Sequence, residues 1–251
     1  MAEMVMVIGK SGAGKSHALK NMDPERTLVV NVCGKRLPIP TQFKYFFKSM
    51  NMNVIRDQLK KMPNNIKAVV LDDFGYIMTD LFMKGHSGGD QFKLYNAIGD
   101  TVYNFFNFVR DELPDDVIVY VIMHEDENDN GSIKPRTIGK LLDQKVCLEG
   151  MVTVCLRAMA TKDGRHIFRV QSDGTDVAKT PEGMFEGTEI ENDLAMVDKR
   201  IREFWNIVDL PPKPAQPAAN TPTAPNQGKA TVTTTNTIPP TTGKPADKKT
   251  A

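Results

Sequence analysis

Residues 4–16 read Met4-Val5-Met6-Val7-Ile8-Gly9-Lys10-Ser11-Gly12-Ala13-Gly14-Lys15-Ser16, and this stretch decides the fold. It begins with an uninterrupted apolar run, residues 4–8, which is typical of a buried parallel strand. Residues 9–16 then match the pattern GxxxxGK[ST] at every defined position. A helix is predicted directly afterwards, at about residues 14–21, so the pattern lies between a strand and a helix, as a phosphate-binding loop (P-loop) requires.

The residue types of this loop suit a nucleoside triphosphate bound with Mg²⁺. Glycines allow backbone N–H groups to turn inward around a phosphate, and the start of the helix adds its dipole. Lys15 is expected to contact the terminal phosphates, and the Ser16 hydroxyl is expected to bind Mg²⁺. The residues predicted to hold the nucleotide are Gly9, Lys10, Ser11, Gly12, Ala13, Gly14, Lys15 and Ser16.

A P-loop also needs an acid on the metal side of the site, and Val69-Val70-Leu71-Asp72 supplies one. The apolar residues predict a buried strand, and the carboxylate of Asp72 emerges at its carboxyl end, where it is expected to hold Mg²⁺. The next residue, Asp73, has two interpretations. It is either the group that orients or deprotonates the attacking water, or a simple loop acid or helix cap.

A third polar residue, His124, is predicted at the end of the strand 117–123. One interpretation makes it a sensor that touches the γ-phosphate, and the other makes it an exposed histidine at a strand end. The polar stretch 125–136 that follows is predicted to be a loop. Its acids, Glu125, Asp126, Glu127 and Asp129, are expected to be solvated.

The remaining pattern predicts an α/β fold with a mostly parallel central sheet and helices on both faces. Further strands are expected at 27–32 and 68–71, and a terminal β-hairpin at 152–157 and 166–170 around a turn at 162–165. Pro38 and Pro40 argue against a regular element in 34–50. Ligands of such folds bind at the carboxyl ends of the strands. The predicted helices lie at about 53–62, 90–113 and 190–208.

Composition divides the chain at about residue 210. The segment 211–251 holds 9 of the 16 prolines, ten threonines and no aromatic residue. Such a composition cannot offset its ordering entropy, so a disordered Pro/Thr-rich tail is predicted for 211–251. Residues 1–210 are predicted to form one P-loop NTPase domain, which carries 27 basic and 30 acidic residues.

The same composition argues against several classes of protein. The three cysteines are far apart and odd in number, which disfavours a disulfide framework or a thiolate zinc site. No apolar run approaches the length of about 20 residues that a membrane span needs. The amino-terminal run is too short for a signal peptide. The expectation is a cytoplasmic protein without a membrane partner.

With these residues in place, the chain resembles the phage nucleotide-binding proteins of the RecA-like P-loop group, AAA-family ATPases that include single-strand annealing recombinases of the RecA-core type. The resemblance covers roughly residues 4–187. Its motifs are the P-loop, Val70-Leu71-Asp72-Asp73, the strand that ends in His124, and Ala178-Lys179-Thr180-Pro181-Glu182-Gly183-Met184-Phe185. The last of these is similar to a basic segment that follows the terminal hairpin in this family.

The resemblance implies a RecA-like fold, with ATP and Mg²⁺ as cofactors. It also implies ATP-dependent binding of single-stranded DNA in recombination or replication, in the cytoplasm of a phage-infected host. A homo-oligomer in which one subunit completes its neighbour's site is expected, with a single-strand-binding protein as a further partner. Lys179 would then reach the neighbour's γ-phosphate as a catalytic cation. The alternatives are an exposed surface lysine, or Arg157 or Arg165 in that catalytic role.

Three functions remain open from the sequence. The first is an ATPase that acts on DNA. Its DNA-facing loop could be lined by four basic residues, which could equally form a solvated face: Lys134, Arg136, Lys140 and Lys145. The second is a nucleotide-gated scaffold that barely hydrolyses ATP; Asp73 in place of glutamate and the mildly acidic core favour it. The third is a nucleotide or nucleoside kinase, but the sequence shows no arginine-bearing lid of the kind such enzymes usually carry.

Overall fold

Strand β1 (Glu3–Gly9) lies inside the sheet, and its side chains alternate between two apolar clusters. Met4, Met6 and Ile8 pack into one cluster, whereas Val5 and Val7 pack into the other. A strand that is buried on both faces reads as a continuous apolar run, which is the pattern seen in the sequence. The structure is a computed structural model that describes residues 1–211 of the chain. The tail predicted at 211–251 therefore lies, apart from Pro211, outside the described residues.

Within residues 1–211, nine strands form a mixed, mostly parallel sheet, in the order β3-β2-β4-β5-β1-β7-β8-β9, with β6 paired to β5. The pairs from β3 across to β7 are parallel, whereas β5–β6, β7–β8 and β8–β9 are antiparallel. This confirms the predicted α/β fold, the mostly parallel sheet and the hairpin near the end of the fold. The further strands are β2 (Thr27–Asn31), β3 (Tyr45–Phe47), β4 (Ala68–Asp72), β5 (Ile118–Glu127), β6 (Ile133–Pro135), β7 (Val154–Ala160), β8 (His166–Arg169) and β9 (Glu189–Glu191).

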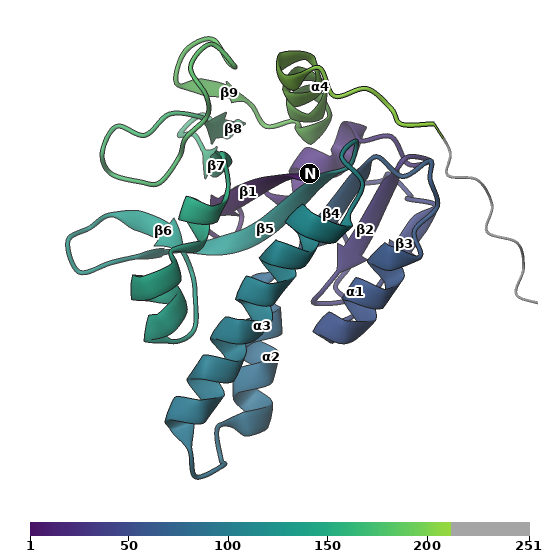
Figure 1. The fold of residues 1–251 in the computed structure, drawn as a ribbon. Coiled ribbons are helices and arrows are strands. Elements are labelled where there is room, and N and C mark those ends of the chain that lie inside the picture. The colour runs from purple at the N-terminus through teal and green to yellow at the C-terminus, as the bar shows by residue number, and fades with distance from the viewer. Residues whose placement is uncertain (212–251) are drawn as a thin grey trace, which may run out of the picture. The chain divides into compact units, whose positions relative to one another are not determined.

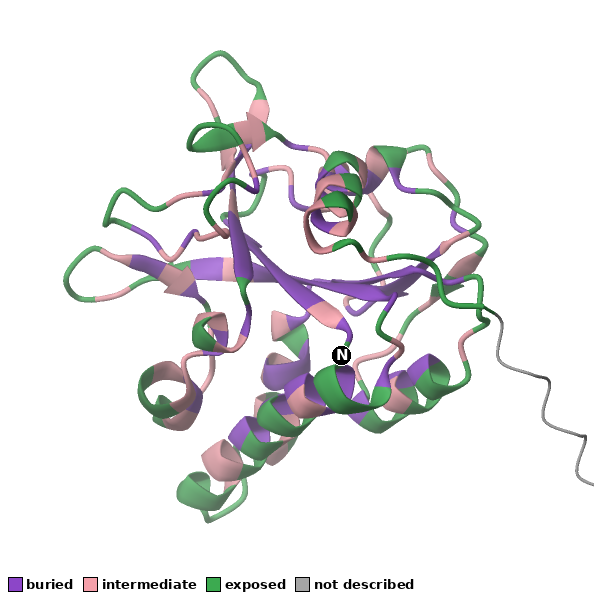
Figure 2. Ribbon diagram, turned by 45° about the horizontal axis from the view of Figure 1, so that its top comes forward, coloured by how far each residue is buried: buried purple, intermediate pink, exposed green. Residues whose placement is uncertain are grey.

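Helices cover both faces of the sheet, as predicted. One face carries α1 (Met52–Lys60), α2 (Gly75–Gly85) and α3 (Gln91–Glu112), which lie below the sheet in Figure 1. The other face carries α4 (Leu194–Trp205) and the 3-10 helix η1 (Ser16–Asn21). The strands between these layers are buried almost throughout (Figure 2). Two short helical segments, η2 (Leu141–Val146) and η3 (Leu148–Met151), precede β7.

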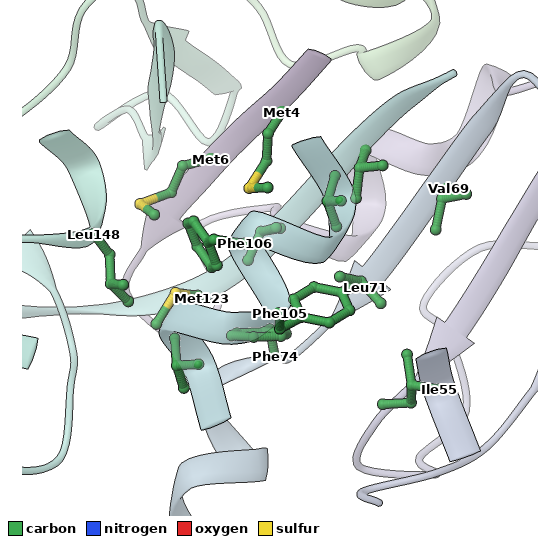
Figure 3. Packing of buried hydrophobic residues seen from close by; sticks show 14 of the residues in the cluster. Met4, Met6, Ile55, Val69, Leu71, Phe74, Phe105, Phe106, Met123 and Leu148 are labelled. Atoms are coloured by element: carbon green, nitrogen blue, oxygen red, sulfur yellow. The ribbon is translucent and has the colours of Figure 1, made fainter. Parts of the chain in front are cut away.

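An aromatic group on the α1–α3 face anchors the loop that follows β4. The ring of Phe74 is fully buried and lies 5.4 Å from that of Phe105 and 6.2 Å from that of Phe106, measured between centroids (Figure 3). Its backbone N–H also donates a 2.8 Å hydrogen bond to the carbonyl of Ile122 on β5. Because Phe74 directly follows Asp72 and Asp73, this packing fixes where the two carboxylates emerge from the sheet.

The structure differs from the sequence analysis in four places. The stretch 34–50 contains the short edge strand β3, which lies beyond the two prolines. Residues 75–85, for which the sequence pattern gave no helix, form α2. Half of 125–136 is strand rather than loop, because β5 continues to Glu127 and pairs with β6 in an antiparallel hairpin. The helix after the P-loop is a 3-10 helix that begins at Ser16 rather than near Gly14.

The other predicted elements are confirmed to within a few residues. The long helix starts at its cap Asp90, whose carboxylate accepts a 2.9 Å hydrogen bond from the N–H of Lys93. Helix α4 starts in the same way at Asp193. None of the helices in residues 1–211 is long and apolar enough to cross a membrane.

Candidate functional site

The order of the strands brings three predicted residues to one edge of the sheet. Gly9 at the end of β1 is in register with His124 on β5, and Asp72 ends β4 on the other side of β5. All three strands are parallel, so their carboxyl ends open on the same edge, where α/β folds bind ligands. Strand β5 therefore places His124 between the P-loop and Asp72.

The glycines of the P-loop are required by its geometry. Gly12 and Gly14 have φ values of 80° and 91°, a region in which residues with a side chain are strained. A Cβ on Gly9 would lie 2.7 Å from the backbone oxygen of Ala158, and one on Gly14 would lie 2.8 Å from the ring of His166. The loop thus fits closely between η1 and the β7–β8 hairpin.

Lys15 is folded back onto its own loop. Its ammonium group donates hydrogen bonds of 2.8 Å to the carbonyls of Gly9 and Lys10, and the residue is only 6% exposed. Burial lowers the pKa of Lys15 from its usual value, while the charges of Asp73 and Asp72 oppose that shift. A lysine ammonium is a mobile triple donor, so phosphate oxygens can take the place of these two carbonyls.

Ser16 and Asp72 meet at the base of the loop. The Ser16 hydroxyl donates a 2.7 Å hydrogen bond to Oδ1 of Asp72, and the other carboxylate oxygen, Oδ2, is buried without a partner in the described residues. Burial raises the pKa of Asp72 to about 6, although the hydrogen bond from Ser16 lowers it. A buried acid with a free oxygen is costly unless a cation or donor completes it.

This pair of oxygen ligands fits Mg²⁺. The ion prefers hard oxygen ligands and, in nucleotide sites, is held by one or two protein groups together with phosphates and water. No cluster of three or more metal-ligating side chains occurs in the part of the chain that the structure describes. A cation at this edge would therefore depend on Ser16, Asp72 and the oxygens of a ligand.

Asp73 has an unusual backbone conformation and lies between two basic side chains. Its φ of 62° is left-handed, which is uncommon for a residue other than glycine and marks local strain. The side chain is 2% exposed; Oδ2 lies 2.5 Å from the ammonium of Lys35, and Oδ1 lies 3.6 Å from Nε2 of His124. The structure thus brings Asp73 and His124 together next to Asp72.

Lys35 is the residue that the sequence analysis missed. It follows β2 in a turn shaped by Asn31, whose side chain accepts from the N–H of Gly34 at 2.8 Å and donates to the carbonyl of Lys35 at 2.5 Å. The ion pair with Asp73 raises the pKa of Lys35. An Asn-x-x-Gly turn after a predicted strand was the available signal, but nothing in it pointed to the carboxylate on β4.

His124 lines a cavity of about 490 Å³ together with Lys10, Ser11 and Lys35. Its ring contacts that of Tyr76, on α2, edge to face at 5.9 Å. Burial, followed by the charge of Lys15, lowers the pKa of His124. Both effects favour the neutral ring, which offers one donor and one acceptor to a ligand.

The acid next to His124 is not solvated, which corrects the expectation for Glu125. Glu125 is 5% exposed and accepts two hydrogen bonds from Arg157 on β7, at 2.9 and 3.1 Å. Arg157 also donates to the buried Asp176 at 3.1 Å. This ion-pair network joins β5, which carries His124, to the terminal hairpin. The guanidinium of Arg157 is already paired with the carboxylates of Glu125 and Asp176.

Among the other basic candidates, Arg136 lines the same cavity as Lys10 and Ser11 of the P-loop, and Arg165 directly precedes His166, whose ring lies against Gly14. Lys179 exchanges two backbone hydrogen bonds of 2.8 Å with Cys155, which is in register with Met6, three residues before Gly9. Arg165 is exposed in the hairpin turn and pairs with Asp163 at 2.6 Å. Of the residues suggested for a DNA-facing loop, Lys134 pairs with Asp143 and Arg136 lies 3.8 Å from Asp126, whereas Lys140 and Lys145 flank or lie in η2.

Comparison with known proteins adds no assignment to this geometry. A scan of protein-family models finds none that matches the chain, and a search of curated proteins finds no match. The function therefore has to be argued from the arrangement at the carboxyl edge of the sheet.

Proposed function

We propose that the protein is a Mg²⁺-dependent ATPase of the RecA-like P-loop type that acts on single-stranded DNA in phage recombination or replication. The observation that carries the proposal is the part-buried hydrogen bond between Ser16 and the fully buried Asp72, beneath a loop that also buries Lys15. A serine hydroxyl, a carboxylate with a free oxygen and a lysine ammonium are the groups that a P-loop enzyme directs at a Mg²⁺-bound triphosphate.

The order of the strands supports the RecA-like part of the proposal. Strand β5 is inserted between β1, which leads into the P-loop, and β4, which ends in Asp72. The insertion brings the end of β5, with His124, between the P-loop and Asp72. In this proposal, His124 contacts the γ-phosphate from that position.

The residues can be given roles in the reaction. The P-loop N–H groups and Lys15 bind the phosphates and neutralise charge on the β- and γ-oxygens. Ser16 and Asp72 would hold Mg²⁺, which would supply a Lewis acid for the charge on the γ-phosphoryl group. Asp73 orients the attacking water and accepts its proton. His124 hydrogen-bonds to the γ-phosphate and, after hydrolysis, to the released phosphate.

DNA coupling would run through the strand that carries His124. Loss of the γ-phosphate changes the hydrogen bonding of His124, and the next residue, Glu125, is tied to Arg157 on the hairpin. The basic residues Lys134 and Arg136 lie on or beside β6, the partner of the same strand. A shift of this strand would therefore reach both the hairpin and the β5–β6 loop.

One observation favours the second candidate, a nucleotide-gated scaffold with little hydrolysis. Asp73 is paired with Lys35 at 2.5 Å, so its carboxylate is held by a cation rather than free to take a proton from water. Unless nucleotide binding separates this pair, turnover will be slow.

The experiment that tests the proposal is the rate of phosphate release from ATP with Mg²⁺, measured alone, with single-stranded DNA and with duplex DNA. The expected result is slow turnover that rises at least tenfold with single strands. ATP binding without turnover under all three conditions would favour the scaffold, and the absence of ATP binding would overturn both candidates. A solution mass measured with and without ATP and oligonucleotide tests the predicted homo-oligomer.

A further inference from the structure

A cleft of about 610 Å³ opens beside the P-loop, at the end opposite to Asp73 and His124. Its walls come from η1, from β8 and from β9, whereas the cavity at His124 is lined by the first residues of the loop. A nucleotide whose phosphates lie in the loop has its base beyond one end of it. The residues of the cleft are His17, Lys20, Arg165, His166, Ile167, Glu189, Ile190, Glu191 and Asn192.

Asn192 is the unexplained residue of this cleft. It follows β9 and is 1% exposed, yet both polar atoms of its side-chain amide are buried without a hydrogen-bond partner in residues 1–211. The adjacent Asp193 already caps α4, so helix capping does not explain the amide. A buried amide left unpaired costs about 1 to 3 kcal/mol. Such a cost is offset when a ligand brings the complementary donor and acceptor.

Two histidine rings line the same cleft and provide a surface for stacking. The rings of His17 and His166 are tilted against one another with their centroids 5.9 Å apart. His166 packs directly on Gly14 of the P-loop, and its Nδ1 is buried without a partner in the described part of the chain. Aromatic faces bind nucleobases of any kind, so the rings give affinity while polar groups give selectivity.

We propose that this cleft binds the base of the nucleotide and that Asn192 selects adenine. An asparagine amide pairs with adenine through two hydrogen bonds: the N6 amine donates to Oδ1, and N7 accepts from Nδ2. Guanine presents two acceptors, O6 and N7, on the same edge and leaves the Oδ1 acceptor unpaired. The inference rests on the proposed function, because the base reaches the cleft only if the triphosphate occupies the P-loop.

The charges around the cleft are compatible with a neutral base. Lys20 and Glu191 lie 3.6 Å apart, and Arg165 is paired with Asp163. Because these basic side chains are already paired with acids, no phosphate is required to neutralise the lining of the cleft. The cleft is therefore suited to the uncharged part of the nucleotide, while Lys15 serves the charged part.

The first test measures competition by ATP, GTP, 7-deaza-ATP and tripolyphosphate, each with Mg²⁺, against a fluorescent ATP analogue bound to the whole chain. ATP is expected to bind about 10- to 100-fold more tightly than GTP and than 7-deaza-ATP, which lacks N7. Equal affinity for ATP and GTP, or a preference for GTP, would overturn the inference. If neither a nucleotide nor tripolyphosphate binds, the proposed function itself fails.

The second test uses Asn192→Leu, which keeps the branching of the side chain at Cγ and removes the unpaired amide. Since the amide has no partner in the fold, the variant should keep or raise the melting temperature. Its preference for ATP over GTP should fall to less than threefold, with unchanged affinity for tripolyphosphate. Asn64→Leu, at an exposed site, is the matched control and should keep the preference. Asn192→Leu with an undiminished preference for ATP would overturn the role of Asn192.

Discussion

Ser16 donates a 2.7 Å hydrogen bond to Asp72, although 56 residues separate them in the chain. The bond joins the helix that follows the P-loop to the end of β4, and its two oxygens are those expected to bind Mg²⁺. The bond satisfies the serine hydroxyl, while the second carboxylate oxygen of Asp72 has no hydrogen-bond partner within residues 1–211. Binding of a metal would exchange a hydrogen bond for two metal–oxygen contacts.

Lys15→Ala should abolish tight binding of Mg²⁺-ATP and leave the fold intact. The loop backbone alone supplies no mobile positive charge, and the variant loses only two hydrogen bonds to loop carbonyls. Titration with a fluorescent ATP analogue and a melting curve check both statements. Lys61→Ala, at an exposed position after α1, is the control. Undiminished turnover in Lys15→Ala would show that the motif takes no part in catalysis.

Asp72→Asn should weaken Mg²⁺-dependent binding and yet stabilise the nucleotide-free protein at pH 7. Asp72 keeps its proton up to about pH 6 in the fold but only to about pH 3.8 in the unfolded chain. Stability is therefore lost as the pH rises between these values, and asparagine removes that loss. The gain in unfolding free energy is about 2 to 3 kcal/mol above pH 6 and vanishes below pH 3.8.

Denaturant unfolding at pH 7 and at pH 3.5 measures this difference between Asp72→Asn and the parent chain. Asp57→Asn, an exposed substitution on α1, should change the stability at neither pH. If Asp72→Asn destabilises the protein at pH 7, the carboxylate is part of the structure rather than a vacant metal ligand.

Asp73→Asn should spare ATP binding and remove hydrolysis. The residue directly follows Asp72, and asparagine tolerates the left-handed backbone conformation but cannot accept a proton. Binding titrations and phosphate release separate the two properties. Should both Asp72→Asn and Asp73→Asn lose only binding, the division of roles between metal and water is wrong.

The sequence predicted the residues of the site better than it predicted the contacts between them. The P-loop pattern and the apolar run before Asp72 are local, so their placement follows from strand and helix order alone. Helix α2 was missed because it begins at Gly75, only two residues after Asp73, and the stretch Asp72-Asp73-Phe74-Gly75 is typical of a loop. Its residue Tyr76 consequently escaped notice, although its ring packs against His124.

Long-range ion pairs explain the other differences. Glu125 was expected in water because it begins an acidic stretch, but Arg157, 32 residues later, buries it in a paired state. The partner of Asp73, Lys35, comes from a different strand end and carries no motif. The sequence spacing of the two partners does not indicate either ion pair, because the register of β2, β4, β5 and β7 brings the partners together.

Deleting 211–251 should leave the melting temperature and the affinity for ATP nearly unchanged. The Pro/Thr-rich composition of this segment provides little apolar surface to bury. The last described contact before it, the hydrogen bond from the N–H of Leu210 to Asp116, is retained in the shortened chain. Calorimetry of both chains is the measurement. A fall of the melting temperature by more than a few degrees would mean that the segment docks on the fold.

Lys179→Ala should bind ATP normally and lose most of its turnover. The backbone of Lys179 is held to Cys155, beside the amino-terminal half of β7, so we expect its side chain to serve a neighbouring subunit's site rather than its own. A cation supplied in trans stabilises the charge that develops in phosphoryl transfer and can contribute about 10³- to 10⁵-fold in rate. Lys162→Ala, in the exposed hairpin turn, should keep its turnover. Mixing Lys179→Ala with Lys15→Ala should partly restore activity, because one mixed interface pairs an intact P-loop with an intact Lys179. If the two variants assemble together, as shown by the solution mass, and no activity returns, Lys179 does not act in trans.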